Sequence, residues 1–140
     1  DVIKNKNKLK EIIQRLSDKD IPVSLFVDPV QAQVENCAEV KAAWVELHTG
    51  KYAITKNKAR GLELSILKES TAKAKSYGLR VNAGHGLTYQ NVEPIAAIEG
   101  IEELNIGHTI ISRALAVGLT QAVKEMKNLI INPRKENYLI

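Results

Sequence analysis

The sequence predicts an α/β fold with four strand–helix units, about half of a (β/α)8 TIM barrel. Short apolar segments alternate with amphipathic helical segments along the chain, a pattern typical of right-handed βαβ units and a parallel sheet. Each predicted strand has one aliphatic face, whereas its other face carries polar residues toward the carboxyl end. A complete barrel takes about 250 residues, and this chain has 140.

The first segments predict a helix over residues 7–19, where apolar residues recur at helical spacing, and a buried strand over residues 22–28 (PVSLFVD). A second apolar helical face runs from residue 30 to residue 38. Cys37, the single cysteine, lies on this face and is predicted to be a core residue and not a nucleophile. Asp28, at the end of the strand, is expected to cap or turn the chain before that helix.

The rest of the chain repeats the alternation. Gly78 stands where helices favour a glycine just after their last turn. Asn91 is expected to cap a short helix, and Pro133 is expected to end the last one. The predicted elements are strands over residues 44–48, 79–83 and 103–106, and helices over residues 57–77, 91–98 and 109–131.

The two faces of the predicted strands help to choose between a barrel and a doubly wound sheet, both of which fit the spacing. Side chains alternate along a strand, so Trp44, Glu46 and His48 oppose Val45 and Leu47. We expect the aliphatic faces to pack against the helices. The polar faces then lie inside a barrel, whose active site forms at the carboxyl ends of its strands.

The composition argues against nucleic-acid and membrane partners. The net charge is +4, and part of it comes from Lys4, Lys6, Lys8 and Lys10, which we interpret as a solvated helix surface. One Phe, one Trp and four Tyr are scattered along the chain and form no platform for stacking bases. No apolar run approaches the ~20 residues that span a bilayer. A single cysteine fits a cytoplasmic location.

All three histidines lie in segments that follow predicted strands: residues 46–50 (ELHTG), 82–88 (NAGHGLT) and 105–109 (NIGHT). Histidine titrates near neutral pH, and flanking glycines allow a tight turn and close approach of a ligand. Gly107 and His108 precede a helix, whose free N–H groups bind anions. The sequence therefore predicts a phosphate site after the last two strands, as in many barrels.

Each of these residues also has an alternative interpretation. The segment around His85 could be a structural turn with an exposed histidine. Glu46 could form an ion pair with a lysine at the rim in place of handling a proton or a cation. His48 could contact a ligand or support a residue that does. The three histidines and Glu46 could hold a metal, but their spacing differs from common zinc motifs, so no metal is expected.

Several strings (SLFVD, VELHTG, RVNAGHGLTYQNV, IAAI and ELNIGH) occur in this order in the pyridoxine 5′-phosphate synthase family, which the chain resembles from about residue 1 to about residue 130. The resemblance implies that residues 1–140 are the C-terminal half of one (β/α)8 barrel domain, with strands five to eight, in a homo-octamer. It also implies a transferase of vitamin B6 biosynthesis. That enzyme condenses 1-deoxy-D-xylulose 5-phosphate with 3-amino-2-oxopropyl phosphate into pyridoxine 5′-phosphate, phosphate and water, without a metal or organic cofactor.

The resemblance also implies roles for five residues. His85 matches the proton donor, and Glu46 matches a glutamate that stabilises the transition state. Gly86, Gly107 and His108 match contacts to the phosphate of the amino ketone. The family's residues from the first half of the barrel have no counterpart here, so we expect a segment of a longer chain. The alternative is a non-catalytic barrel domain that binds a phosphorylated metabolite, which would need neither a titrating His85 nor a charged Glu46.

Overall fold

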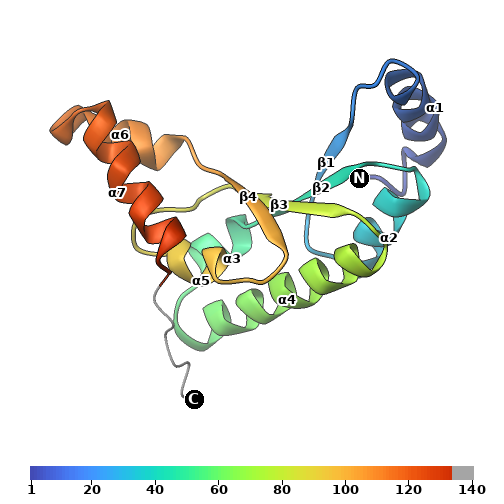
Figure 1. Ribbon diagram of the computed structural model, residues 1–140. Helices are drawn as coiled ribbons and strands as arrows, with labels where there is room; N and C mark the ends of the chain where they lie inside the picture. Colours follow the sequence, from blue (N-terminus) through green and yellow to red (C-terminus); the bar gives the residue numbers. More distant parts are fainter. Residues whose placement is uncertain (134–140) are drawn as a thin grey trace.

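The computed structural model of the protein describes residues 1–133. Four parallel strands lie in the order β1-β2-β3-β4 and form one twisted sheet (Figure 1). The strands are β1 (Ser24–Val27), β2 (Trp44–His48), β3 (Arg80–Gly84) and β4 (Ile101–Asn105). The helices are α1 (Lys6–Ser17), α2 (Gln31–Glu39), α3 (Gly50–Ile54), α4 (Asn57–Ser76), α5 (Val92–Ala96), α6 (His108–Val117) and α7 (Leu119–Ile131).

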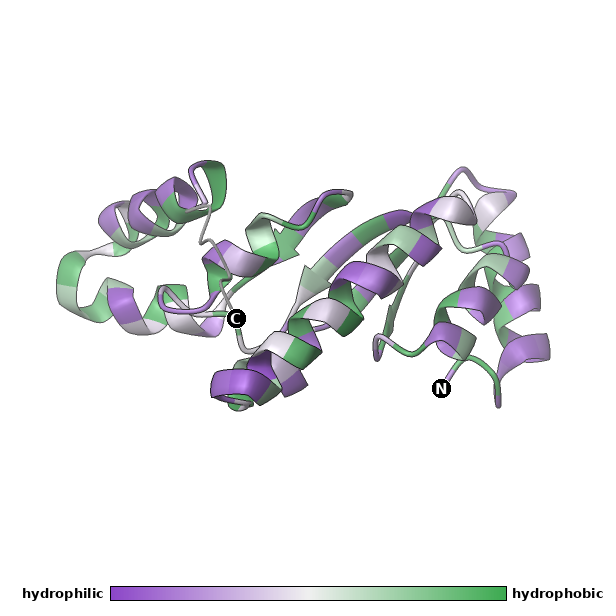
Figure 2. Ribbon diagram, turned by 90° about the horizontal axis from the view of Figure 1, so that it is seen from below, coloured by the Kyte–Doolittle hydropathy of each residue, from purple (hydrophilic) through white to green (hydrophobic). Residues whose placement is uncertain are grey.

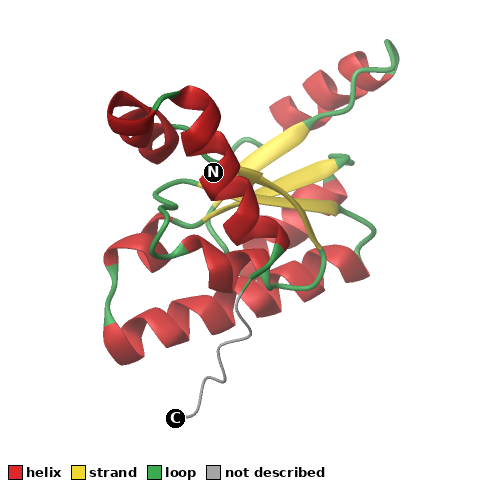
Figure 3. Ribbon diagram, turned by 60° about the vertical axis from the view of Figure 1, so that its left-hand side comes forward, coloured by secondary structure: helices red, strands yellow, loops and turns green. Residues whose placement is uncertain are grey.

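The helices that connect the strands cover one face of the sheet, as Figure 3 shows for α2, α4 and α5. α1 and the packed pair α6 and α7 lie at opposite ends of the sheet (Figure 1). The predicted α/β class and the parallel four-stranded sheet are confirmed. The assignment of residues 1–140 to one domain stays a prediction, and residues 134–140 lie outside the described part.

The core forms where the aliphatic faces of the strands meet the helices, as the alternation predicted. Val45, Leu47 and Val81 are fully buried in it. Cys37 of α2 is fully buried too, and burial raises the pKa of its thiol to about 11. A thiol that stays protonated at neutral pH is a poor nucleophile, so the prediction that Cys37 is a core residue is confirmed.

The helix predictions fail in two places: one predicted helix is broken, and one helix was not predicted. The expected helix over residues 109–131 is interrupted at Gly118, whose φ of 82° separates α6 from α7. Glycine adopts this left-handed conformation without strain. The sequence also did not predict α3, which directly follows β2. α3 has five residues and no helical repeat of apolar residues. Contacts with distant residues stabilise it, because the buried Tyr52 donates a hydrogen bond to the carbonyl of Asn91 at 2.8 Å.

Neither Asp28 nor Asn91 caps a helix with its side chain, but the alternative turn role expected of Asp28 is confirmed. α2 follows Val30 with no side-chain cap, and the carboxylate of Asp28 lies against His48 instead. The backbone carbonyl of Asp28 does take part in the turn, where it accepts the N–H of Val30 at 2.7 Å. Asn91 precedes α5, but its side chain forms no cap there. Its hydrogen bonds go to the loop after β3, which could not be foreseen from local sequence.

The face of the sheet opposite the helices is uncovered within residues 1–133. Phe26 of β1 projects from it and is 55% exposed. β1 and β4 each pair with one neighbour, so the sheet has two free edges. Figure 2, seen from the helix side, shows hydrophilic and hydrophobic residues mixed on the helices, as expected for helices with one face in solvent. No helix in this range is long and apolar enough to cross a bilayer.

We predict that residues 1–140, expressed alone, self-associate. Free strand edges are templates for pairing with other chains, and no strand among residues 1–133 covers the outer edge of β1 or of β4. The open face adds exposed apolar surface around Phe26. Size-exclusion chromatography with light scattering, at several protein concentrations, measures the association.

The matched control is Leu115→Lys, which removes the most exposed large apolar side chain (89% exposed) but leaves both edges unchanged. Association that persists in this variant points to the edges and the open face. A monomer at all concentrations would contradict the prediction.

Candidate active site

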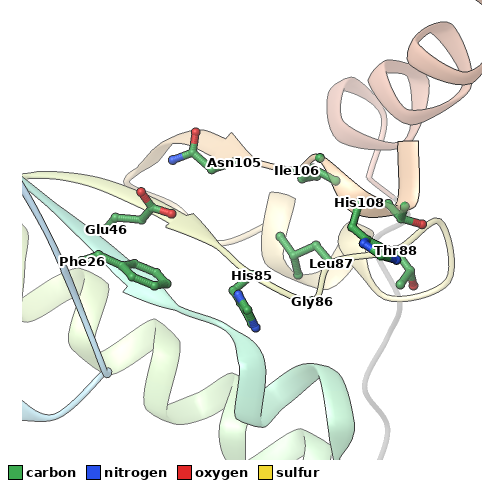
Figure 4. Close-up of a pocket in the computed structure, with 11 residues that line it drawn as sticks. Phe26, Glu46, His85, Gly86, Leu87, Thr88, Asn105, Ile106 and His108 are labelled. Carbon is green, nitrogen blue, oxygen red and sulfur yellow. The ribbon is translucent and has the colours of Figure 1, made fainter. Parts of the chain in front are cut away.

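The loops that follow β3 and β4 line a cleft of about 570 Å³ at the carboxyl ends of the strands, together with Glu46 of β2 (Figure 4). All five predicted site residues line it: Glu46, His85, Gly86, Gly107 and His108. Parallel pairing brings them together, because each loop leaves the sheet at the same end. Other lining residues include Phe26, Asn105 and segment 87–88.

Glu46 lies on the open face of β2, beside Asn82 of β3 in the ladder. Its carboxylate reaches over Gly84, where an added Cβ would lie 2.6 Å from Oε1 of Glu46 and 2.9 Å from the carbonyl oxygen of Asn105. Glycine at position 84 therefore leaves the space that the carboxylate occupies. In Figure 4 the carboxylate points toward Asn105. Glu46 forms no ion pair with any described residue, so the alternative of a lysine partner is not realised there.

His85 directly follows β3 and has a φ of 86°, which non-glycine residues rarely adopt. Gly86 has a φ of 74°, and an added Cβ there would lie 2.7 Å from the Cβ of Ala53. The predicted tight turn is present, but its glycines differ in role. Gly84 stays in the strand, and His85 itself carries the unusual backbone conformation. Such strain clusters at functional sites.

Thr49, which follows β2, forms hydrogen bonds to the start of this turn. Its N–H donates to the carbonyl of Gly84 at 2.8 Å. Its hydroxyl lies 2.7 Å from the same oxygen and 2.6 Å from the carbonyl oxygen of His85. Thr49 is fully buried. The sequence analysis did not single out this residue, because a threonine between His48 and a glycine carries no local signal for contacts 35 and 36 residues away.

Asn91 holds the next part of the same loop. Its Oδ1 accepts the N–H of Thr88 at 2.7 Å, and its Nδ2 donates to the carbonyl of Gly86 at 3.2 Å. The hydroxyl of Tyr52 in turn holds the carbonyl of Asn91. The loop after β3 therefore has two separate anchors, Thr49 at its start and Asn91 at its end.

His48 lies next to His85, with 4.7 Å between the ring centroids. Its Nδ1 is 3.1 Å from Oδ1 of Asp28, and Phe26 packs edge-on against it. Gly50 makes this neighbourhood possible, since an added Cβ would lie 2.7 Å from Cε1 of His48 and 3.2 Å from Cδ2 of His85. His48 does not line the main cleft, which favours the supporting role over direct ligand contact.

The first turn of α6 faces the same cleft. Gly107 occupies the position before the helix, without a side-chain cap, and α6 begins at His108. The first N–H groups of a helix have no intrahelical acceptor. Gly107 has a φ of −123°, and an added Cβ would have no atom within 4 Å. Neither the backbone conformation nor the packing requires glycine at position 107. What distinguishes Gly107 is that it leaves the start of α6 open to the cleft.

Within residues 1–133, no group of three or more His, Cys, Asp or Glu side chains is arranged to hold a metal ion. The groups that line the cleft can bind an anion and can exchange protons with a ligand. Backbone N–H groups of α6 and the imidazole of His108 are on one side. The carboxylate of Glu46 is on the other.

Comparison with known proteins places the chain among enzymes of one family. The family described as pyridoxal phosphate biosynthesis protein PdxJ matches residues 1–132. The chain is 91% identical over 140 residues to pyridoxine 5′-phosphate synthase of Prochlorococcus marinus (strain NATL1A), covering 100% of this chain and 57% of that protein. It is 59% identical over 138 residues to the synthase of strain MIT 9211, with 99% and 57% covered.

The synthase of Synechococcus sp. (strain WH7803) is 62% identical over 136 residues, with 97% of this chain and 55% of that protein covered. The chain thus spans little more than half the length of the relatives it matches. The resemblance that SLFVD, VELHTG, NAGHG and NIGH indicated is confirmed. With a family match over nearly all of its length, this chain belongs to the family of the pyridoxal phosphate biosynthesis protein PdxJ.

Proposed function

We propose that this chain is the C-terminal half of a (β/α)8 barrel that, in the complete polypeptide, synthesises pyridoxine 5′-phosphate. The substrates are 1-deoxy-D-xylulose 5-phosphate and 3-amino-2-oxopropyl phosphate, and the products are pyridoxine 5′-phosphate, phosphate and water. The observation that carries the proposal is the meeting in one cleft of a strained His85, the start of α6, and a Glu46 that forms no ion pair within residues 1–133.

Three features of the sheet support a half barrel. Both edges are free, and the face away from the helices is uncovered in the described part. Asn82 on that face is 7% exposed, yet its Oδ1 has no hydrogen-bond partner within residues 1–133. Buried polar atoms are almost always paired, so a partner from outside the described residues would satisfy it. The relatives have the additional length that such a partner requires.

The phosphate of the amino ketone is proposed to bind between the two glycine loops. Gly107 offers open space for close approach, and the first N–H groups of α6 and the His108 side chain supply donors. Gly86, across the cleft, adds its backbone N–H. A phosphate held at fixed donors orients the carbon skeleton, which converts binding energy into positioning of the reacting atoms.

The chemistry proposed for His85 and Glu46 follows from the condensation of the substrate amine with a ketone. The amine of one substrate attacks the ketone of the other, and the resulting carbinolamine loses its hydroxyl as water to form a Schiff base. An imidazole can act as a general acid and protonate that leaving hydroxyl. Glu46, whose carboxylate has no cationic partner in the described part, can stabilise the developing iminium charge.

The alternative is a non-catalytic domain that binds a phosphorylated metabolite. Such a domain would use the glycine loops and α6 alone. It would not need a histidine held in a costly backbone conformation, or a nearby carboxylate that has no counter-ion among residues 1–133. These two features favour the enzyme. Assembly into a homo-octamer stays a prediction from the family resemblance, and a cytoplasmic location stays a prediction from the single cysteine.

We predict that His85→Gln in the complete chain lowers turnover by about 10²–10⁴-fold, the usual contribution of a general acid or base. Gln carries no titrating group but has a similar size. His85→Asn serves as a second variant, because Asn tolerates a positive φ better than most residues. Circular dichroism and steady-state kinetics are measured together. Turnover close to wild type in either folded variant would remove His85 from the mechanism.

We predict that Gly107→Val weakens phosphate binding by about tenfold or more, the loss expected for one or two hydrogen bonds to a charged group. The valine has room in the free protein but blocks the approach of a ligand to α6. Calorimetric titration of the complete chain with a stable phosphorylated ketone, such as dihydroxyacetone phosphate, measures the affinity.

The control for this variant is Gly61→Val in α4, where an added Cβ also has no atom within 4 Å and the cleft is not involved. This control should bind as the wild type does. Equal affinities in both variants would place the phosphate elsewhere.

We predict that Glu46→Gln lowers kcat by at least about tenfold while the thermal midpoint hardly changes. The substitution removes a charge proposed to act on an intermediate and breaks no ion pair within residues 1–133. Glu103→Gln is the matched control, because Glu103 lies on β4 of the same sheet, separated from β2 by β3, and does not line the cleft. Equal activities of the two variants would argue against a specific role for Glu46.

A further inference from the structure

The conformation of His85 has to be maintained by other residues. A non-glycine residue with a φ of 86° is strained and persists only when its surroundings determine it. The side chain of His85 is exposed and outside the apolar core. Packing of the imidazole therefore cannot hold the backbone in this state, and the hydrogen bonds of the turn must do so.

These hydrogen bonds divide between two residues. Asn91 bonds to Gly86 and Thr88, on the far side of the turn. On the near side, the Thr49 hydroxyl lies 2.6 Å from the carbonyl oxygen of His85 and 2.7 Å from that of Gly84, both within the normal range for O–H···O bonds. The hydroxyl hydrogen is thus shared between two consecutive carbonyls, on either side of the strained φ.

We propose that Thr49 is a positioning residue for His85, and that its hydroxyl holds the backbone conformation that aims the imidazole at the substrate. The proposal rests on the proposed function of His85 as the proton donor. Thr49 itself does not line the cleft and is fully buried, so it acts on the reaction only through the turn.

The surroundings of His85 explain why a small change in the turn matters. The imidazole lies between Gly50 and the ring of His48, whose centroid is 4.7 Å away. A relaxation of φ toward the usual negative range would swing the side chain out of this position. Catalytic groups need to be held within about 0.5 Å of their productive geometry, so loss of the hydroxyl should act mainly on the chemical step. Substrate phosphate binding has its own anchors at Asn91 and α6.

The test compares Thr49→Val and Thr49→Ser in the complete chain. Valine keeps nearly the same shape and removes the hydroxyl, whereas serine keeps the hydroxyl and removes a methyl group. We expect Thr49→Val to lower kcat by about 10- to 100-fold, the effect of a misplacement near 1 Å. The KM for the phosphorylated amino ketone should change by less than about threefold. Thr49→Ser should retain kcat within about threefold of wild type.

A double-mutant cycle with His85→Asn distinguishes positioning from a general structural effect. If Thr49 acts through His85, Thr49→Val should cost less than about twofold in kcat when His85 is already replaced. Equal losses in both backgrounds would overturn the proposal, because Thr49 would then act independently of His85. Wild-type kcat in folded Thr49→Val would also overturn it, and would leave the role of His85 intact.

Two further outcomes are informative. Wild-type activity in His85→Asn would refute the proposed function itself, and with it the basis of this inference. If Thr49→Val does not fold, Thr49→Ala and Thr49→Ser provide the same comparison with and without the hydroxyl. Equal kcat in that pair would overturn the role of Thr49.

Discussion

Parallel pairing of β2 with β3 and of β3 with β4 is the interaction on which the rest of the structure depends. The ladders place Glu46 beside Asn82 and His48 beside Gly84, and they place Gly84 beside Asn105. Because all strands run in one direction, every loop that carries a histidine leaves the sheet at the same end. A shift of one residue in either ladder would turn the aliphatic face outward and would separate Glu46 from the cleft. The aliphatic core therefore also fixes the geometry of the candidate site.

The glycines around the cleft illustrate how one residue type serves different physical needs. Gly84 leaves space for the carboxylate of Glu46, whereas Gly86 combines a positive φ with close contact to Ala53. Gly107 has an ordinary backbone conformation and empty space above it. The sequence does not distinguish these three glycines, and it predicts the same role for each, which is close approach of a ligand. Only for Gly107 is open space the feature that distinguishes it.

The open face of the sheet indicates that the proposed enzyme needs residues beyond those described. Phe26 is exposed, the buried Oδ1 of Asn82 lacks a partner in the described part, and both sheet edges are free. A closed barrel would resolve all three, since closure removes edges and covers the interior. The proposed roles give the candidate site a phosphate-binding end, a proton donor and a carboxylate. A condensation of two substrates requires further contacts, which fits a chain that spans little more than half the length of the relatives it matches.

The sequence by itself determined the α/β class, the positions of the strands and the grouping of His85, Glu46, Gly86, Gly107 and His108 at one end of the sheet. These features follow from local periodicity and from the shared direction of parallel strands, which a pattern of apolar and polar residues records. The tertiary structure decided the rest: the strain at His85, the hydroxyl of Thr49 that spans two carbonyls, and the use of Asn91 to tie a loop in place of capping a helix. These contacts join residues that are distant in the chain or depend on exact distances, so no local pattern encodes them. The break at Gly118 belongs to the same group, because a glycine inside a helical pattern is often tolerated, and only the packing of α6 against α7 shows that the chain turns there.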